Sequence, residues 1–178
     1  MPVKGFSVAK ERLAPALPPH QRAALARSMA SAVVRAARPL PVAVVCDDAE
    51  VAAWAEAEGA LVVWAPGRGL DGAVAHGVEV LGDGGAGRVV VAHGDLPLAT
   101  DLAWVARFAG VTLVPDRRDD GTNVACVPAG ARFPFAYGPG SFARHAAAAL
   151  RLGFPLRVVR EPALGRDVDL PSDLAITR

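Results

Sequence analysis

The sequence predicts an α/β fold in which a mostly parallel sheet is covered by helices on both faces. Short runs of β-branched residues alternate with longer segments that carry apolar residues at helical spacing, and this βαβα order favours parallel strands joined by right-handed crossovers. The strand-like runs are apolar throughout rather than at every second position, as expected for strands buried on both faces. With 178 residues, 52% of them hydrophobic, the chain can bury one good core, so we expect a single domain over residues 1–178.

The predicted elements begin with the end of a first strand at Met1 to Val3. Pro18 and Pro19 suit the first turn of a helix, which extends to about Arg38. The further predicted strands cover residues 41–46, 61–64, 88–95, 111–115, 123–128 and 156–160, and the further predicted helices cover residues 47–58, 72–81, 100–108 and 141–152. No helix separates the strand at 111–115 from the strand at 123–128, which favours an antiparallel pairing of these two.

The composition argues against several classes of partner. The formal net charge is +1 and the charges are scattered, so the sequence offers no basic stripe for nucleic acid and no basic amphipathic helix for a membrane. No apolar run approaches the length of a membrane span, and residues 1–10 lack the apolar stretch of a signal peptide. Cys46 and Cys126 stand alone without metal-ligand spacing, so we expect free buried thiols, which fit a cytoplasmic protein. We therefore expect small-molecule partners, and a homodimer remains open.

The central predicted strand ends at a carboxylate. Residues 88–92 are mostly β-branched, and Pro97 cannot continue a strand because it lacks an N–H group. The chain therefore turns at Asp95. Ligands of open α/β sheets bind beyond the carboxyl ends of the strands, so Asp95 is well placed to hold a metal ion or a ribose. The alternative is an ordinary turn residue, because aspartate is common in turns.

The lysines of the chain lie together in its first ten residues. Lys4 and Lys10 belong to a short loop that also contains Arg12, and every other cationic residue of the chain is an arginine. Lysine is a compact point charge and arginine is a planar fork, so the retained lysines indicate a contact with phosphate from one direction. The loop has neither a GxGxxG nor a GxxxxGK[ST] pattern, but its cations can hold a triphosphate by charge. The alternative is a solvated basic turn.

Two further loops carry candidate binding residues. The loop over residues 65–72 contains glycines, among them Gly69, that allow close approach of a flat ligand. Asp71 in this loop could cap the next helix or accept a hydrogen bond from a base. The glycine-rich turn at Gly138 opens a helix at Ser141, which suits a small anion and is equally typical of a serine N-cap.

A last candidate site lies near the C-terminus. Asp167 and Asp169 are two positions apart in a segment that reads as extended chain, so their carboxylates point the same way. One cation could therefore take a ligand from either residue.

These candidates lie in motifs that occur together in one family. The motifs are the Lys4 to Leu13 loop, Gly69-Leu70-Asp71-Gly72, Gly94-Asp95-Leu96-Pro97, Asp119-Asp120-Gly121-Thr122-Asn123, Tyr137-Gly138-Pro139-Gly140-Ser141-Phe142 and Asp167-Val168-Asp169-Leu170-Pro171-Ser172-Asp173-Leu174. Together they closely resemble the guanylyltransferases of deazaflavin coenzyme F-420 biosynthesis. The resemblance implies a Rossmann-like three-layer α/β/α sandwich of the nucleotide-diphospho-sugar transferase type. The sequence departs from the family pattern in two features. The first strand begins late, and Asp71 stands where asparagine is usual.

The resemblance implies an enzyme that transfers GMP from GTP to a phosphorylated three-carbon acid, phosphoenolpyruvate or 2-phospho-L-lactate, and releases pyrophosphate. The alanine- and arginine-rich composition indicates a GC-rich bacterial source. The bacterial branch resembled here is associated with phosphoenolpyruvate, so we expect enolpyruvoyl-2-diphospho-5'-guanosine as the product. Two alternatives stay open. One is another small nucleotidyltransferase with a pterin or sugar-phosphate acceptor, and the other is a nucleotide-binding module without catalysis.

The family pattern also implies roles for the candidate residues. Mg²⁺ is the expected cofactor, because the acceptor phosphate is already an anion and catalysis is mainly positioning and charge neutralisation at the α-phosphorus. The implied catalytic residues are Lys4, Lys10, Arg12 and Asp95, the implied metal ligands are Asp95, Asp167 and Asp169, the implied acceptor-binding residues are Thr122, Gly138 and Ser141, and the implied nucleotide-binding residues are Gly69 and Asp71.

Overall fold

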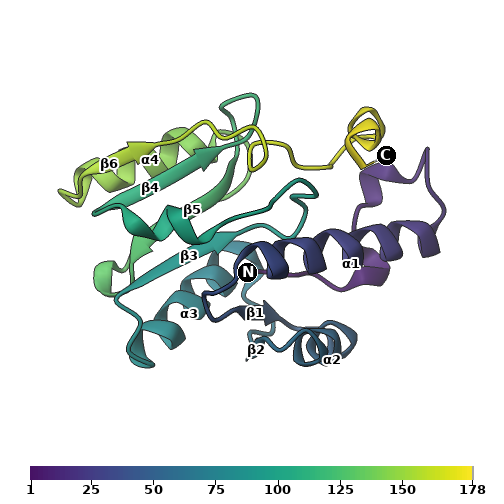
Figure 1. Cartoon of the computed structure of the whole chain (residues 1–178), viewed down its shortest axis with the longest axis horizontal. Coiled ribbons are helices and arrows are strands. Elements are labelled where there is room, and N and C mark those ends of the chain that lie inside the picture. Colours follow the sequence, from purple (N-terminus) through teal and green to yellow (C-terminus); the bar gives the residue numbers. More distant parts are fainter. Residues whose placement is uncertain (178) are drawn as a thin grey trace.

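The computed structural model describes residues 1–177 and has the predicted three-layer α/β/α arrangement, with helices on both faces of the central strands (Figure 1). Residue 178, the end of the predicted domain, lies outside the described part of the chain. The strands are β1 (Ala43–Cys46), β2 (Leu61–Trp64), β3 (Arg88–Ala92), β4 (Val111–Pro115), β5 (Thr122–Pro128) and β6 (Leu156–Val158). The α-helices are α1 (Pro19–Ala36), α2 (Ala49–Ala57), α3 (Gly69–Asp83) and α4 (Ser141–Arg151). The 3₁₀ helices are η1 (Phe6–Val8), η2 (Glu11–Leu13), η3 (Ala103–Arg107), η4 (Ala129–Ala131) and η5 (Pro171–Thr177).

The strands of the larger sheet run mostly in one direction. This sheet has the order β3–β5–β4–β6, in which β4 and β6 are parallel. β5 is antiparallel to both of its neighbours, as predicted from the missing crossover helix. β1 and β2 form a separate parallel pair, and the first predicted strand is reduced to one parallel bridge from Pro2 to Val45. The carboxyl ends of β3, β4 and β6 therefore share one edge, and β5 starts at that edge.

The apolar clusters on the two faces explain why the strands lack polar alternation. On one face α3 and α4 pack against β3, β4 and β5, and Ala125 of β5 belongs to this cluster. On the other face α1 and η3 cover the same strands, and the neighbouring residue Val124 belongs to that cluster. Both residues are fully buried. Successive side chains of a strand point to opposite faces, so a strand covered on both sides has no solvated position.

Several helix boundaries differ from the sequence prediction. α3 begins at Gly69 rather than at residue 72, and Asp71 lies inside its first turn, so Asp71 is not the N-cap. The N-cap of α4 is Gly140, whose φ of 72° favours glycine, rather than Ser141. The predicted helix over residues 100–108 is only the 3₁₀ turn η3.

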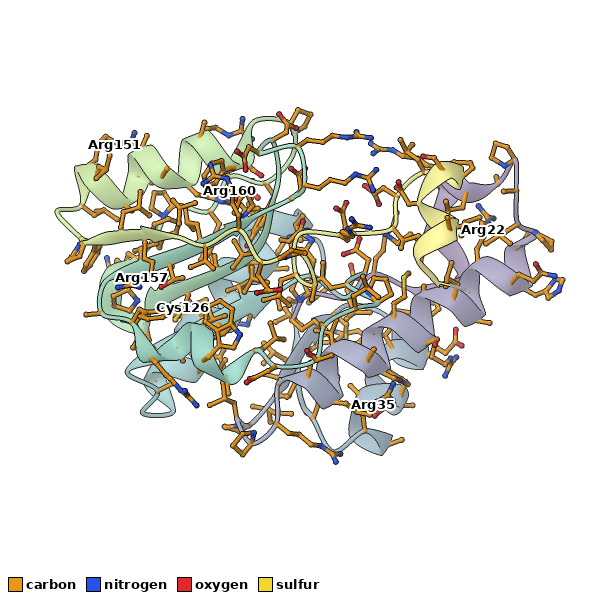
Figure 2. All side chains as sticks on the ribbon, turned by 45° about the horizontal axis from the view of Figure 1, so that its top comes forward. Arg22, Arg35, Cys126, Arg151, Arg157 and Arg160 are labelled. Atoms are coloured by element: carbon orange, nitrogen blue, oxygen red, sulfur yellow. The ribbon has the colours of Figure 1, made fainter. Side chains whose placement is uncertain are left out.

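The polar surface agrees with the scattered charge of the sequence. Figure 2 shows Arg35 on α1 and Arg151 on α4 pointing outward from different sides of the molecule, and both side chains are exposed. Cys46 and Cys126 are buried free thiols, as predicted. Among residues 1–177, no helix combines the length and the apolar character that crossing a membrane requires.

The C-terminal segment returns to the loop that precedes α1, and η5 lies beside this loop (Figure 1). Leu13 of the loop and Val168 of the C-terminal segment are fully buried in one cluster with Met29 of α1. Val168 lies between Asp167 and Asp169 in the chain. Its burial therefore anchors both carboxylates close to the cationic N-terminal loop.

Gly77 is a point of close approach between α3 and β1. A β-carbon at this position would lie 2.5 Å from Cγ2 of Val45, which is itself buried. We expect Gly77→Ala to lower the free energy of unfolding by about 1–2 kcal/mol, because overpacking outweighs a gain of about 1 kcal/mol in helix propensity. Denaturant unfolding measures this change. Gly87→Ala is the control, since no atom lies within 4 Å of its added carbon, and equal effects of the two substitutions would contradict the packing argument.

Candidate active site

Two cavities meet beyond the carboxyl ends of the strands, where open α/β sheets bind their ligands. The larger cavity, of about 760 Å³, is lined by the N-terminal loop and by the start of α3. The smaller cavity, of about 340 Å³, is lined by the loop between β4 and β5 and by the turn before α4. Arg12, Asp95 and Asp169 line both cavities, so the two spaces join at a group of charged side chains.

The predicted nucleotide and acceptor residues separate into these two cavities. The larger one is lined by Lys4, Lys10 and Gly69, and the smaller one by Thr122, Gly138, Ser141 and Asp167. Asp95 stands where they join. A donor and an acceptor bound one in each cavity would therefore meet at Asp95.

Lys10 links the two carboxylates at the junction. Its Nζ donates to Oδ2 of Asp95 at 2.6 Å and to Oδ1 of Asp169 at 2.9 Å. Burial alone would lower the pKa of Lys10, but the two carboxylates raise it above its ordinary value. Burial alone would raise the pKa of Asp95, but Lys10 holds it below its ordinary value. Both groups are thus charged at neutral pH, and the predicted contact of Lys10 with a triphosphate stays a prediction.

The backbone of Lys10 is in a left-handed conformation, with φ of 55° and ψ of 40°. This conformation costs a non-glycine residue roughly 1–3 kcal/mol and persists only where the surroundings enforce it. Leu13 enforces it here, because its side chain is fully buried and its N–H donates to the carbonyl of Lys10 at 2.9 Å. The loop thereby directs the ammonium of Lys10 inward, while Arg12 stays 75% exposed and lies 3.6 Å from Asp169.

Asp95, Asp167 and Asp169 carry more charge than Lys10 and Arg12 compensate, so they could contribute ligands to a divalent cation. Oδ1 of Asp95 is buried and has no hydrogen-bond partner among the described residues. Burial, followed by the proximity of Asp95, raises the pKa of Asp167. In the described part of the chain no three His, Cys, Asp or Glu side chains form a group that could hold a metal ion, so the predicted ligands Asp95, Asp167 and Asp169 are not arranged as one three-residue site. Mg²⁺ suits this partial set, because it commonly takes one or two carboxylates and completes its shell with water and substrate phosphates.

Asp173 shapes the loop that carries Asp169. Its carboxylate accepts from the N–H groups of Asp169 at 3.0 Å and Leu170 at 2.8 Å, and from Arg117 at 2.6 Å. Burial alone would raise the pKa of Asp173, but the Arg117 guanidinium and the two N–H groups hold it below its ordinary value. Sequence reasoning gave Asp173 no role, although it is the last acidic position of the C-terminal motif.

The smaller cavity presents hydroxyl groups. Thr122 and Ser141 are 3% and 1% exposed, and the N–H of Thr122 donates to Oγ of Ser141 at 3.0 Å. The adjoining turn is held from α4, because Arg144 donates to the carbonyls of Ala136 at 2.9 Å and Pro139 at 2.6 Å. Gly138 in this turn has a φ of 97°, which requires glycine.

Asp71 makes a contact that the sequence did not predict, and its predicted contact with a base stays a prediction. It does not line either cavity, and its Oδ1 accepts a hydrogen bond from the N–H of Tyr137 at 2.7 Å. Asp71 therefore connects α3 to the turn before α4, and the structure gives it no position against a base or ribose. Its partner lies 66 residues away in the chain, which is why local sequence reasoning could not find it.

His93 and Tyr137 also line the candidate site, and the sequence did not indicate a role for either residue there. Both line the smaller cavity, and their ring centroids lie 4.9 Å apart. Nε2 of His93 and the hydroxyl of Tyr137 are buried, and neither has a hydrogen-bond partner among the described residues. Burial lowers the pKa of His93, so its ring is neutral at physiological pH. His93 continues an apolar strand and Tyr137 lies among glycines and prolines, so neither stands in a pattern that indicates a ligand.

Known proteins resemble this chain along its whole length. The family model described as "Guanylyl transferase CofC like" matches residues 1–176. The chain is 38% identical to a phosphoenolpyruvate guanylyltransferase of Sphaerobacter thermophilus, over 98% of this chain and 88% of the relative. It is 37% identical to a protein of the same name from Rubrobacter xylanophilus, over 98% of this chain and 90% of the relative.

Solved structures support the fold type. A protein of Desulfovibrio desulfuricans, described as a candidate nucleotide-diphospho-sugar transferase, has a TM-score of 0.78 at 16% identity, and the match covers 99% of this chain and 83% of that one. CMP:2-keto-3-deoxy-manno-octonic acid synthetase complexed with CTP has a TM-score of 0.59 at 14% identity, covering 99% and 94%. With a family model that spans residues 1–176 and relatives that share more than a third of its residues, the chain belongs to the CofC-like guanylyl transferase family.

Proposed function

We propose that the protein transfers GMP from GTP to phosphoenolpyruvate, giving enolpyruvoyl-2-diphospho-5'-guanosine and pyrophosphate in coenzyme F-420 biosynthesis. The observation that carries this proposal is the junction of two cavities at Asp95, Lys10 and Asp169. One cavity carries a cationic loop suited to a triphosphate, and the other is smaller and carries hydroxyl donors suited to a compact anion. The names of the relatives from Sphaerobacter thermophilus and Rubrobacter xylanophilus support the choice of both substrates.

The reaction needs positioning more than proton transfer. An oxygen of the acceptor phosphate attacks the α-phosphorus of GTP, and the bond from that phosphorus to the bridging oxygen of pyrophosphate breaks. The attacking phosphate is already an anion, so no strong general base is required. Lys4 and Arg12 would neutralise charge on the leaving pyrophosphate, while Thr122 and Ser141 would donate to the acceptor.

Mg²⁺ is the cofactor that we propose for this site. Asp95 and Asp167 would hold it, because Oδ1 of Asp95 has no other partner in the described chain and Asp167 is poorly neutralised. When bound, it would neutralise phosphate charge and orient the nucleotide. Asp169 would contribute less, because Lys10 and Arg12 already compensate its charge.

The printed names of the relatives favour a three-carbon acid over a pterin or sugar phosphate. Phosphoenolpyruvate and 2-phospho-L-lactate differ only in a planar methylene against a tetrahedral methyl-bearing carbon, a difference worth about 1–3 kcal/mol to a pocket. Mass spectrometry of the product formed from GTP, Mg²⁺ and equal concentrations of both acids decides between them. We expect the enolpyruvoyl product to dominate. A dominant lactyl product would overturn the acceptor alone, and no guanylylated product would overturn the proposed function.

Asp95→Asn tests whether the charge of Asp95, where the two cavities join, is needed for turnover. Asparagine keeps an oxygen that can accept from Lys10, so the fold should persist, but the negative charge at the metal position is lost. We expect turnover to fall by about 100-fold or more with an unchanged melting temperature. Asp83→Asn is the matched control, because Asp83 is an exposed carboxylate at the end of α3 and should leave turnover unchanged. Wild-type turnover in Asp95→Asn would reduce Asp95 to a turn residue.

Lys10→Arg tests the point-charge role of this lysine. The side chain of Lys10 is 12% exposed and its Nζ fits between two carboxylates, which leaves little room for a longer planar guanidinium. We expect kcat to fall and KM for GTP to rise by about tenfold each, equivalent to about 1.4 kcal/mol. Steady-state kinetics with GTP as the varied substrate measures both. If kcat and KM both match the wild type, a generic positive charge is sufficient.

A further inference from the structure

His145 is a fully buried polar residue behind the smaller cavity. It lies on α4 and is 0% exposed. Its ring contacts those of Phe133, Phe135 and Tyr137, with centroids 5.8, 6.1 and 4.9 Å away. An imidazole in such aromatic surroundings needs partners for both nitrogens, and both are present.

The hydrogen bonds of His145 determine its tautomer. The N–H of Ala136 donates to Nε2 at 2.9 Å, so Nε2 must carry a lone pair and cannot be protonated. In the neutral ring the proton is therefore on Nδ1, which lies 3.0 Å from Oγ1 of Thr122. Burial, followed by the proximity of Arg144, lowers the pKa of His145 to about 4, so the neutral form is present at physiological pH.

This tautomer determines whether the hydroxyl of Thr122 can donate a hydrogen bond to a ligand. Nδ1–H of His145 donates to the hydroxyl oxygen of Thr122, so the hydroxyl proton of Thr122 remains available for another acceptor. No other side-chain or backbone partner of this hydroxyl occurs among the described residues. Thr122 lines the smaller cavity. Its O–H group is therefore a hydrogen-bond donor that is available to a ligand.

The hydroxyl of Ser141 is also free to donate a hydrogen bond, because its oxygen already accepts one from the protein. Its oxygen accepts from the N–H of Thr122 at 3.0 Å, which leaves its own proton available. Ser141 also lines the smaller cavity. Two neighbouring hydroxyls that each accept from the protein present a pair of donors, which is the arrangement that an anionic oxygen requires.

We propose that His145 is a positioning residue for the acceptor, a role that rests on the proposed function. Its Nδ1–H occupies a lone pair of the Thr122 hydroxyl and thereby keeps the hydroxyl proton directed at the acceptor's phosphate or carboxylate. His145 itself does not line the cavity and acts through Thr122.

Two substitutions separate this role from packing. In His145→Asn the amide nitrogen is bonded to Cγ, as Nδ1 is, so a donor to Thr122 is kept while the acceptor for Ala136 is lost. In His145→Gln the amide oxygen is bonded to Cδ, near the position of Nε2, so the acceptor is kept while the donor is lost. Both variants lose one buried hydrogen bond, and we expect similar melting temperatures for the two.

The acceptor kinetics distinguish the two variants. We expect His145→Gln to raise KM for phosphoenolpyruvate by about tenfold or more, since a directed hydrogen bond to an anion is lost. We expect His145→Asn to stay within about threefold of the wild type. KM for GTP should change little in both. Equal KM values for phosphoenolpyruvate in the two variants, or the reverse order, would overturn the positioning role.

Thr122→Val completes the test as a double-mutant cycle. If His145 acts through Thr122, adding His145→Gln to Thr122→Val gives no further rise in KM for phosphoenolpyruvate. If the rise in KM for phosphoenolpyruvate in the double variant equals the product of the rises in the two single variants, the positioning role is overturned and Thr122 remains an acceptor contact. A wild-type KM for phosphoenolpyruvate in Thr122→Val would remove Thr122 from the acceptor site and the role of His145 with it, while guanylyl transfer would stand.

Discussion

The ammonium of Lys10 joins three parts of the chain that are far apart in sequence. It binds Asp95, three residues beyond the end of β3, and Asp169 near the C-terminus. Without this cation, Asp95, Asp167 and Asp169 would leave three like charges in a partly buried site. Burial, followed by the proximity of Asp95, raises the pKa of Asp167 even with Lys10 present. This concentration of negative charge supports the proposed binding of a further cation.

The reversed direction of β5 completes the site. Open α/β sheets bind ligands beyond the carboxyl ends of their strands, and a parallel β5 would place its first residue at the edge opposite to the carboxyl ends of β3 and β4. Because β5 is antiparallel, Thr122 pairs with Pro115 at the end of β4, and Val124 pairs with Ala92 at the end of β3. The start of β5 therefore brings a hydroxyl to the same edge as Asp95. A short polar loop is sufficient for this, whereas a crossover helix would have been needed for a parallel strand.

The sequence predicts the parts of this protein that depend on local pattern. Residues close together in the sequence determine each of these features, which are the alternation of apolar runs, the turn at Asp95 and the antiparallel start of β5. The hydrogen bonds of Asp71 and Ser141 were not predictable, because their partners, Tyr137 and Thr122, come from distant segments. The sequence did not indicate His145 either, since it lies in an alanine-rich helix and its proposed role depends on which ring nitrogen bears the proton.

The two cavities differ in the groups that line them, and the proposed reaction gives a reason for the difference. The cationic loop on the nucleotide side suits a leaving pyrophosphate, whose growing charge direct cations stabilise. An attacking phosphate that was tightly paired with a cation would be a weaker nucleophile. The smaller cavity is lined by Arg12, Arg117 and Arg118 together with the neutral hydroxyls of Thr122 and Ser141, and Arg117 is paired with Asp173 at 2.6 Å. In the proposed reaction the two hydroxyls would hold the acceptor as neutral donors and leave its charge available for attack.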